Sequence, residues 1–265
     1  EGDACDRQLV GSDCHVDASS GTPWIFEDYW VAHPSASLTI KPSYHLGYGS
    51  DMPGLDANIR SLHDLVGNAA TRDSLGNPVH IVVGVGSTEL ISAALFALAT
   101  VHGDRGNASK VWAARPYYSG YTLPSSTFAS GLFQWDDAAT PPPDGRVIEL
   151  VTSPNNPDGH MRGPMADPSR RAVLMDHAYY WPHFVGIPRP VAYGDDTISL
   201  FTLSKLTGHA SSRIGWAITT NRALAEAMRS FIHVVGDVPR ENQMRAITVL
   251  DHVLHHSGEI FSYAR

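Results

Sequence analysis

The sequence ISLFTLSKLTGHASSRIGWAIT (residues 198–219) joins two short apolar runs through a loop of small and polar residues. Lys205, one of only three lysines in the chain, follows the first run, and Arg213 lies eight positions later. A lysine that attacks a carbonyl group needs a desolvated setting or a cationic neighbour, which leaves its amine unprotonated. A strand, a polar turn, a lysine and a phosphate-pairing arginine are typical of a pyridoxal phosphate (PLP) site. On its own such a lysine would be read as a surface residue, but other segments favour a Schiff-base role for Lys205.

Composition excludes several classes of protein. The chain has 265 residues, of which 43% are hydrophobic and 17% charged, enough for one large core or two modest ones. Its formal net charge of −8 argues against a nucleic-acid or anionic-membrane partner. The longest apolar stretch, residues 90–101, is interrupted by Ser92 and is shorter than the ~20 residues of a membrane span. We therefore expect a globular chain without a membrane span.

Residues 1–23 are polar and turn-rich, and we interpret them as a lead-in rather than a domain. Both cysteines, Cys5 and Cys14, lie there, which favours the tail of a disulfide-bearing module; the alternative is two incidental thiols. Asn107-Ala108-Ser109 is a sequon for N-glycosylation within a polar turn. These features together favour a glycoprotein of the secretory pathway, vacuolar or extracellular, with a cytoplasmic location as the alternative.

Short apolar runs alternate with helical patterns along the rest of the chain. The runs predict strands at 79–85, 111–114, 131–135, 147–152, 172–175, 198–202 and 215–219, and the helical patterns lie at 56–66, 88–101, 222–234 and 240–256. This alternation predicts an α/β fold with a mostly parallel sheet. In such sheets ligands collect at the carboxyl ends of the strands.

Polar segments that follow these strands carry groups suited to PLP. Residues 86–88 (Gly-Ser-Thr) open a helix, whose N–H groups and hydroxyls can bind a phosphate. The rigid turn at 154–157 (Pro-Asn-Asn-Pro) can present an amide to a ring oxygen. Asp176, three residues before Tyr179, can keep a pyridine nitrogen protonated while the tyrosine bonds the phenolic oxygen. Residues 116–118 offer an aromatic face, and each segment taken alone could also be an ordinary turn or core element.

Other catalytic patterns are missing from the sequence. Gly84 and Gly86 begin a dinucleotide-type glycine pattern, but Glu89 occupies the position of its third glycine. The chain has no His-Glu-x-x-His metal motif and no Gly-x-Ser-x-Gly elbow. Three histidines on the last predicted helix are expected to lie on a solvated face rather than to bind a metal: His252, His255 and His256.

Taken in order, these motifs resemble fold-type I PLP enzymes, and more closely the plant family that joins alliinases to tryptophan aminotransferase-related proteins. The resembling segments are VGNAA (66–70), GVGST (84–88), VTSPNNPDG (151–159), AYYWPH (178–183) and SKLTGH (204–209). The resemblance covers nearly all of residues 14–265. It implies a three-layer PLP-binding large domain over residues 24–265, with the family's small C-terminal domain missing after Arg265. It also relates Cys5 and Cys14 to the last two cysteines of an EGF-like module.

The resemblance implies roles for individual residues. Lys205 would hold the cofactor and carry a proton. Asn156 and Tyr179 would bond the ring oxygen, and Asp176 would pair with the ring nitrogen. Tyr118 would stack on the ring. The phosphate would be held by Ser87, Thr88, Thr202 and Arg213, with Tyr48 contributed by a partner subunit, which implies a homodimer.

We consider three functions. Two are enzyme activities on a small amino-acid substrate, and the third is a non-catalytic role. Residues 86–88, 156–159 and 177–181 are similar to the aminotransferase branch, which we favour. Residues 21–30 and the two cysteines are similar to the alliinase branch, which cleaves a C–S bond in S-alkyl-cysteine sulfoxides. A non-catalytic structural subunit is the third hypothesis, against which the complete set of Lys205, Asp176, Asn156 and Arg213 argues.

Overall fold

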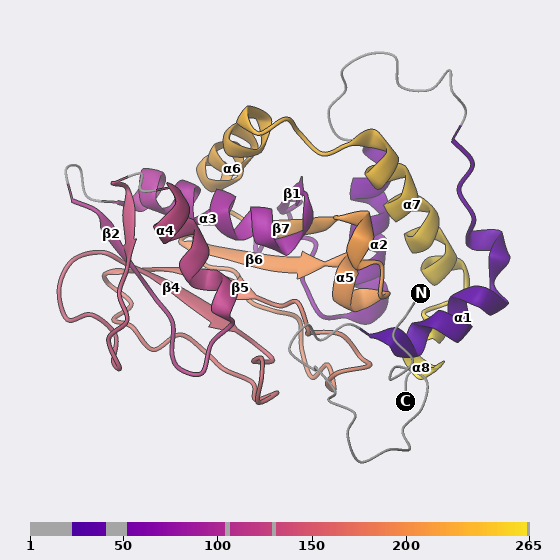
Figure 1. The fold of residues 1–265 in the computed structure, drawn as a ribbon, viewed down its shortest axis with the longest axis horizontal. Helices are drawn as coiled ribbons and strands as arrows, with labels where there is room; N and C mark the ends of the chain where they lie inside the picture. Colours follow the sequence, from indigo (N-terminus) through magenta and orange to yellow (C-terminus); the bar gives the residue numbers. More distant parts are fainter. Residues whose placement is uncertain (1–22, 41–51, 104–106, 129–130, 264–265) are drawn as a thin grey trace, which may run out of the picture.

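A single sheet organises the molecule (Figure 1). The computed structural model describes residues 23–40, 52–103, 107–128 and 131–263. Within them seven strands pair in the order β1-β7-β6-β5-β4-β2-β3. Their bounds are β1 (His80–Gly84), β2 (Ser109–Trp112), β3 (Phe133–Trp135), β4 (Val147–Thr152), β5 (Arg171–Asp176), β6 (Thr197–Thr202) and β7 (Gly215–Thr219). Among the described strands only β7 runs in the direction opposite to the other six, so the prediction of a mostly parallel α/β sheet is confirmed.

Helices cover both faces of this sheet. They are α1 (Glu27–Ala32), α2 (Pro53–Val66), α3 (Gly86–His102), α4 (Leu123–Phe128), α5 (Leu203–Leu206), α6 (Arg222–Val234), α7 (Arg240–His255) and α8 (Glu259–Tyr263), with 3-10 turns η2 (Trp24–Phe26), η3 (Pro34–Ala36), η4 (Ser119–Thr122) and η5 (Ala210–Ser212). The helix α3, rich in buried Ala and Leu, packs against β5, β6 and β7 and is covered by α6. Helices apolar on all sides are typical of buried positions between layers.

Helix α2 packs with α7 on the opposite face, which gives the three predicted layers. Gly215 lies against Ser87 of α3, and since side chains alternate along a strand, Trp216 must point away from α3. On that side Trp216 meets His63 of α2, with 5.8 Å between the ring centroids. Strands buried on both faces become continuous apolar runs, as in β4 and β7, whose residues are all buried.

A buried histidine joins three distant segments on the α2 side. Trp216 Nε1 donates to His63 Nε2 at 2.8 Å, and His63 Nδ1 lies 2.8 Å from Asn68 Oδ1. Since Nε2 accepts, the hydrogen of the neutral ring is on Nδ1 and is donated to Asn68. The amide of Asn68 in turn donates to the Tyr180 carbonyl at 2.7 Å. Burial lowers the pKa of His63 to about 4, so the ring is neutral at physiological pH.

The expectation of a solvated histidine face is wrong for His252. Its side chain is buried, and its Nε2 lies 3.1 Å from the hydroxyl of Tyr29. The reason is that α1 packs beside α7, which the periodicity of α7 alone does not reveal. His255 and His256 are exposed, as predicted.

Several predictions concern parts outside the described residues: Cys5, Cys14 and Tyr48. In the described part of the chain no helix has the length and apolar character needed to cross a membrane. No group of three or more His, Cys, Asp or Glu there could hold a metal ion.

Candidate functional site

A pocket of about 300 Å³ opens where β4, β5 and β6 end and α3 begins. Carboxyl ends of parallel strands are the expected ligand position in this type of sheet. Every predicted site residue that the structure describes lines this pocket: Ser87, Thr88, Tyr118, Asn156, Asp176, Tyr179, Thr202, Lys205 and Arg213. The structure thus brings these nine residues together in one pocket, while their contacts with a ligand stay a prediction. We call this cavity the Lys205 pocket.

Lys205 lies in the short helix α5, directly after β6. The Thr202 hydroxyl caps this helix by accepting the Ser204 backbone N–H at 3.3 Å, which holds the lysine at the strand end. The Lys205 ammonium nitrogen lies 5.8 Å from the centroid of the Tyr179 ring. Burial lowers the pKa of Lys205, against the opposing effect of the Asp176 charge. A lowered pKa increases the share of unprotonated amine, the form that acts as a nucleophile and as a base.

Asp176 places a buried carboxylate at the end of β5. Its Oδ2 accepts a hydrogen bond from the Tyr121 hydroxyl at 2.8 Å, and its Oδ1 accepts the Ala178 N–H at 3.0 Å. Burial raises the pKa of Asp176, while these two hydrogen bonds and the charge of Lys205 favour the ionised form. A buried carboxylate that lines a pocket favours a cationic partner, such as a protonated ring nitrogen.

The lining of the Lys205 pocket also presents a phenol and an amide together. Asn156 Nδ2 donates to the Tyr179 hydroxyl at 3.2 Å. Burial raises the pKa of Tyr179 to about 12, with the Asp176 charge acting in the same direction, so the phenol keeps its proton. The protonated hydroxyl can donate to an oxygen on a bound ring. Tyr118, which also lines the pocket, is a partly exposed ring that contacts Tyr121 edge to face at 5.6 Å.

The start of α3 and Arg213 form the anion-binding end. Gly86 has φ +76°, and a Cβ there would lie 2.5 Å from Arg213 Nη2, so only glycine fits. Arg213 Nη2 is held by the Val85 carbonyl at 3.3 Å. The hydroxyls of Ser87 and Thr88 lie on the same first turn, beside backbone N–H groups that carry the positive end of the helix dipole.

These groups fit PLP by their chemistry. Anion donors lie at one end of the Lys205 pocket, a buried carboxylate lies at the end of β5, and a half-buried amine lies on the wall. PLP carries a phosphate, a pyridine nitrogen and an aldehyde, which demand those three kinds of partner. The fit rests on the donor set and on the space that Gly86 leaves for Arg213.

The sequence did not indicate Tyr121, Thr152 and Ser204. Tyr121 is buried, and its hydroxyl contacts both Asp176 and, at 2.5 Å, Thr152 Oγ1. Its spacing of three residues from Tyr118 is the only signal, since one turn of a 3-10 helix places both rings on the same side, and the two rings are in contact. The Ser204 hydroxyl accepts a hydrogen bond from Thr202 Oγ1 at 3.1 Å. Its position next to Lys205 is the only feature of the sequence that points to it.

Comparison with solved structures gives the class of fold. A solved aminotransferase from Mycobacterium tuberculosis superposes with a TM-score of 0.60 over 94% of this chain and 75% of that chain, at 17% sequence identity. The architecture is therefore that of fold-type I enzymes, as predicted. A family model described as "Allinase" matches residues 16–264, and the chain belongs to this alliinase family.

Curated relatives fall into both branches of the family. The chain is 39% identical to tryptophan aminotransferase-related protein 2 of Arabidopsis thaliana, over 92% of this chain and 56% of that protein. It is 32% identical to alliin lyase 1 of Allium sativum, over 96% of this chain and 52% of that protein. The chain thus spans about half the length of the curated relatives it matches.

Proposed function

We propose that residues 24–265 form the PLP-binding domain of an enzyme that acts on L-amino acids through Lys205, most directly an aminotransferase. The observation that carries this proposal is the meeting of Lys205, Asp176, Asn156 and Arg213 in one pocket at the strand ends. The higher identity to a tryptophan aminotransferase-related protein than to an alliin lyase supports the aminotransferase branch.

The side chains of this chain divide the work. Bound PLP supplies an electron-withdrawing ring that stabilises negative charge at the substrate carbon. Lys205 Nζ would remove the proton from that carbon and return one, and the lowering of its pKa by burial favours this role. Asp176 keeps the ring nitrogen protonated, and Tyr179 with Asn156 orients the ring oxygen. Arg213 and the first turn of α3 anchor the phosphate, so the ring cannot shift during proton transfer.

C–S bond cleavage of the alliinase type is the second candidate. The matched alliin lyase covers nearly all of this chain, and both reactions begin with the same proton removal by Lys205. The two reactions would differ in where Lys205 delivers its proton and in whether a sulfur group leaves the substrate. Retention of Lys205, Asp176 and Arg213 argues against the third candidate, a non-catalytic subunit.

Assembly and location are part of the proposal. A homodimer would bring Tyr48 of one copy to the phosphate site of the other. Asn107 is exposed in the turn before β2, where a glycan has room, and this supports a glycoprotein of the secretory pathway.

The scarcity of lysine makes the test sharp. Only Lys41, Lys110 and Lys205 can hold PLP, apart from the chain's amino terminus. The full chain is incubated with PLP and reduced with borohydride, which fixes the cofactor to the amine that binds it. Peptide mass mapping should find the added mass on Lys205, together with a visible absorption band before reduction. Lys205→Ala should abolish both signals, while Lys110→Ala, which removes a surface ion pair with Asp136, should leave them intact.

Label on Lys110 or Lys41, or no label at all with PLP in excess, would refute the cofactor site. Product analysis then separates the two reactions. Keto-acid formation from L-tryptophan with a 2-oxo-acid acceptor identifies an aminotransferase, whereas pyruvate release from an S-alkyl-cysteine sulfoxide identifies a lyase.

A further inference from the structure

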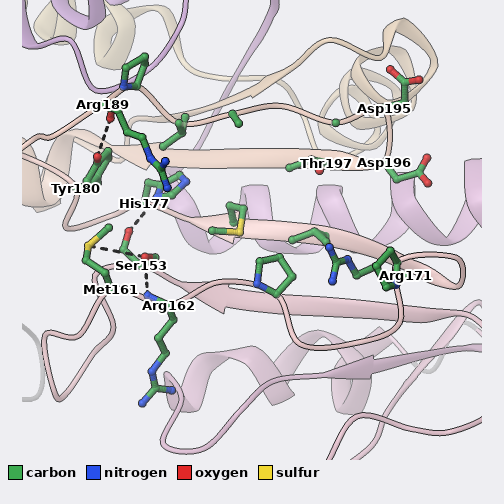
Figure 2. Close-up of a pocket in the computed structure, with 18 residues that line it drawn as sticks. Ser153, Met161, Arg162, Arg171, His177, Tyr180, Arg189, Asp195, Asp196 and Thr197 are labelled. Atoms are coloured by element: carbon green, nitrogen blue, oxygen red, sulfur yellow. Dashed lines mark hydrogen bonds between the residues drawn. The ribbon is translucent and has the colours of Figure 1, made fainter.

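A second pocket, of about 630 Å³, lies on the face of the sheet opposite α3 (Figure 2). Because side chains alternate along β5, Val173, Met175 and the following His177 face this pocket, whereas Asp176 faces the Lys205 pocket. We call it the His177 pocket. Its volume is in the range of small-molecule sites, about 300–1,000 Å³.

His177 supplies an unused acceptor at one end of this pocket. The side chain is only 3% exposed, and its Nδ1 lies 2.9 Å from the Ser153 carbonyl oxygen. A carbonyl only accepts, so Nδ1 carries the hydrogen and Nε2 is a bare acceptor. Nε2 is buried and has no hydrogen-bond partner among the described residues. Burial lowers the pKa of His177 to about 4, so protonation does not satisfy this atom near neutral pH. A bound molecule that carries a hydrogen-bond donor would satisfy this atom.

Arg189 supplies a cation at the same end. Figure 2 shows its side chain directed toward His177, with Ser153 close by, while Asp195 and Asp196 lie at the far end. Arg189 is exposed and forms no ion pair with a carboxylate of the described residues. Its backbone is fixed, because the Tyr180 hydroxyl donates to the Arg189 carbonyl at 2.8 Å. A guanidinium in this setting is suited to a carboxylate.

The wall between the two ends is largely apolar. Val173 and Met175 form it from the strand, and Val191, Pro190 and Pro164 contribute from the loops. If the ligand carried only a carboxylate, its oxygens could not donate to His177 Nε2, and this acceptor would stay without a donor. The geometry points to a small organic acid with an apolar body and a hydroxyl or ammonium group on the carbon next to the carboxylate. Its carboxylate pairs with Arg189, its donor binds His177 Nε2, and its body covers Met175.

Three probes of equal carbon skeleton test this site: L-leucine, L-2-hydroxy-4-methylpentanoate and 4-methylpentanoate. Binding to the full chain is measured by calorimetry after incubation with PLP and borohydride reduction, with the unreduced chain measured in parallel. The ¹⁵N resonance of His177 Nε2 is followed by NMR, since a donated hydrogen bond shifts it. At least one of the two substituted acids should bind, and 4-methylpentanoate should bind about tenfold more weakly, as the loss of one buried hydrogen bond predicts.

Arg189→Gln is the decisive variant, and Arg222→Gln, at an arginine that is also exposed but lies outside the pocket, is its control. Arg189→Gln should weaken binding about tenfold or more, as expected for a charge-assisted pair, while Arg222→Gln should not change it. Binding of L-leucine alone, or of the hydroxy acid alone, supports the site and identifies the ligand class. Equal affinities of all three probes, equal effects of the two variants, or an unshifted His177 resonance would each overturn the proposal. These readouts do not depend on PLP, so failure of the proposed enzyme function would be seen separately.

Discussion

Acidification from neutral pH should destabilise this fold through two histidines that are buried without charge. His63 is held between Trp216 and Asn68, and His177 donates to the Ser153 carbonyl. Burial lowers the pKa of both to about 4. In the unfolded chain each imidazole returns to an ordinary pKa of about 6.5. The unfolded state therefore binds more protons between these two values, so the stabilisation is complete above about pH 6.5 and is lost as the pH falls toward 4.

The size of the effect follows from the two pKa values. At about pH 5 an unfolded histidine is almost fully protonated and a folded one is almost fully neutral. Integrating the linkage from about pH 7 to about pH 5 gives a loss of about 2 kcal/mol for each histidine. The pair should therefore reduce the free energy of unfolding by about 4 kcal/mol, a large share of the stability of a typical domain.

Urea denaturation followed by tryptophan fluorescence at the two pH values measures this loss. A His177→Gln variant should lose about 2 kcal/mol less than the wild type between the two pH values, because one of the two groups no longer titrates. His233→Gln, at a 79% exposed site, is the matched control and should keep the full pH dependence. The reasoning is refuted if the wild type changes by less than about 1 kcal/mol, or if both variants follow the wild type.

Two substitutions in the Lys205 pocket have defined consequences. Gly86→Ala should both destabilise the chain by more than about 1 kcal/mol and weaken PLP binding, because the new carbon meets Arg213 as well as the φ of +76°. Gly76→Ala, at φ +84° with open space around it, should show only the backbone cost in stability. If the two variants lose the same stability in urea and the same affinity in PLP titrations, the clash with Arg213 is contradicted. Tyr121→Phe should raise the pKa of Asp176 and weaken PLP binding about tenfold, since the carboxylate loses a buried donor. Unchanged affinity in a fluorescence titration would exclude that role.

The positions of the strands follow from sequence because each is an apolar run between turn residues. The predicted bounds of β4 and β7 agree with the structure, and those of β1 differ by one residue at each end. The direction of β7 could not be predicted, since it depends on how β7 pairs with its two neighbours. One of them, β6, is close in the chain, whereas β1 is far away. Local patterns contain no information on such partners.

The site residues could be predicted from the sequence for a related reason. Each follows a strand, and parallel strands end at one edge, so order along the chain predicts proximity. Tyr121 was not predicted because the direction of its side chain is set by the turn η4 rather than by a strand. The burial of His252 could not be predicted because it depends on contact with α1. The His177 pocket could not be predicted because it depends on which part of a sheet face the helices leave uncovered.

The edge position of β1 has a consequence for biosynthesis. Among the described strands β1 pairs only with β7, and the register joins His80 to Thr219. A ribosome that has not yet extended the chain past β7 therefore leaves β1 without its ladder and the apolar α3 without the layer that buries it. Contacts of such sequence separation form slowly and expose apolar surface meanwhile. Nascent chains halted before Gly215 should therefore bind chaperones strongly, and chains released past Val234, which include both β7 and α6, should bind them less.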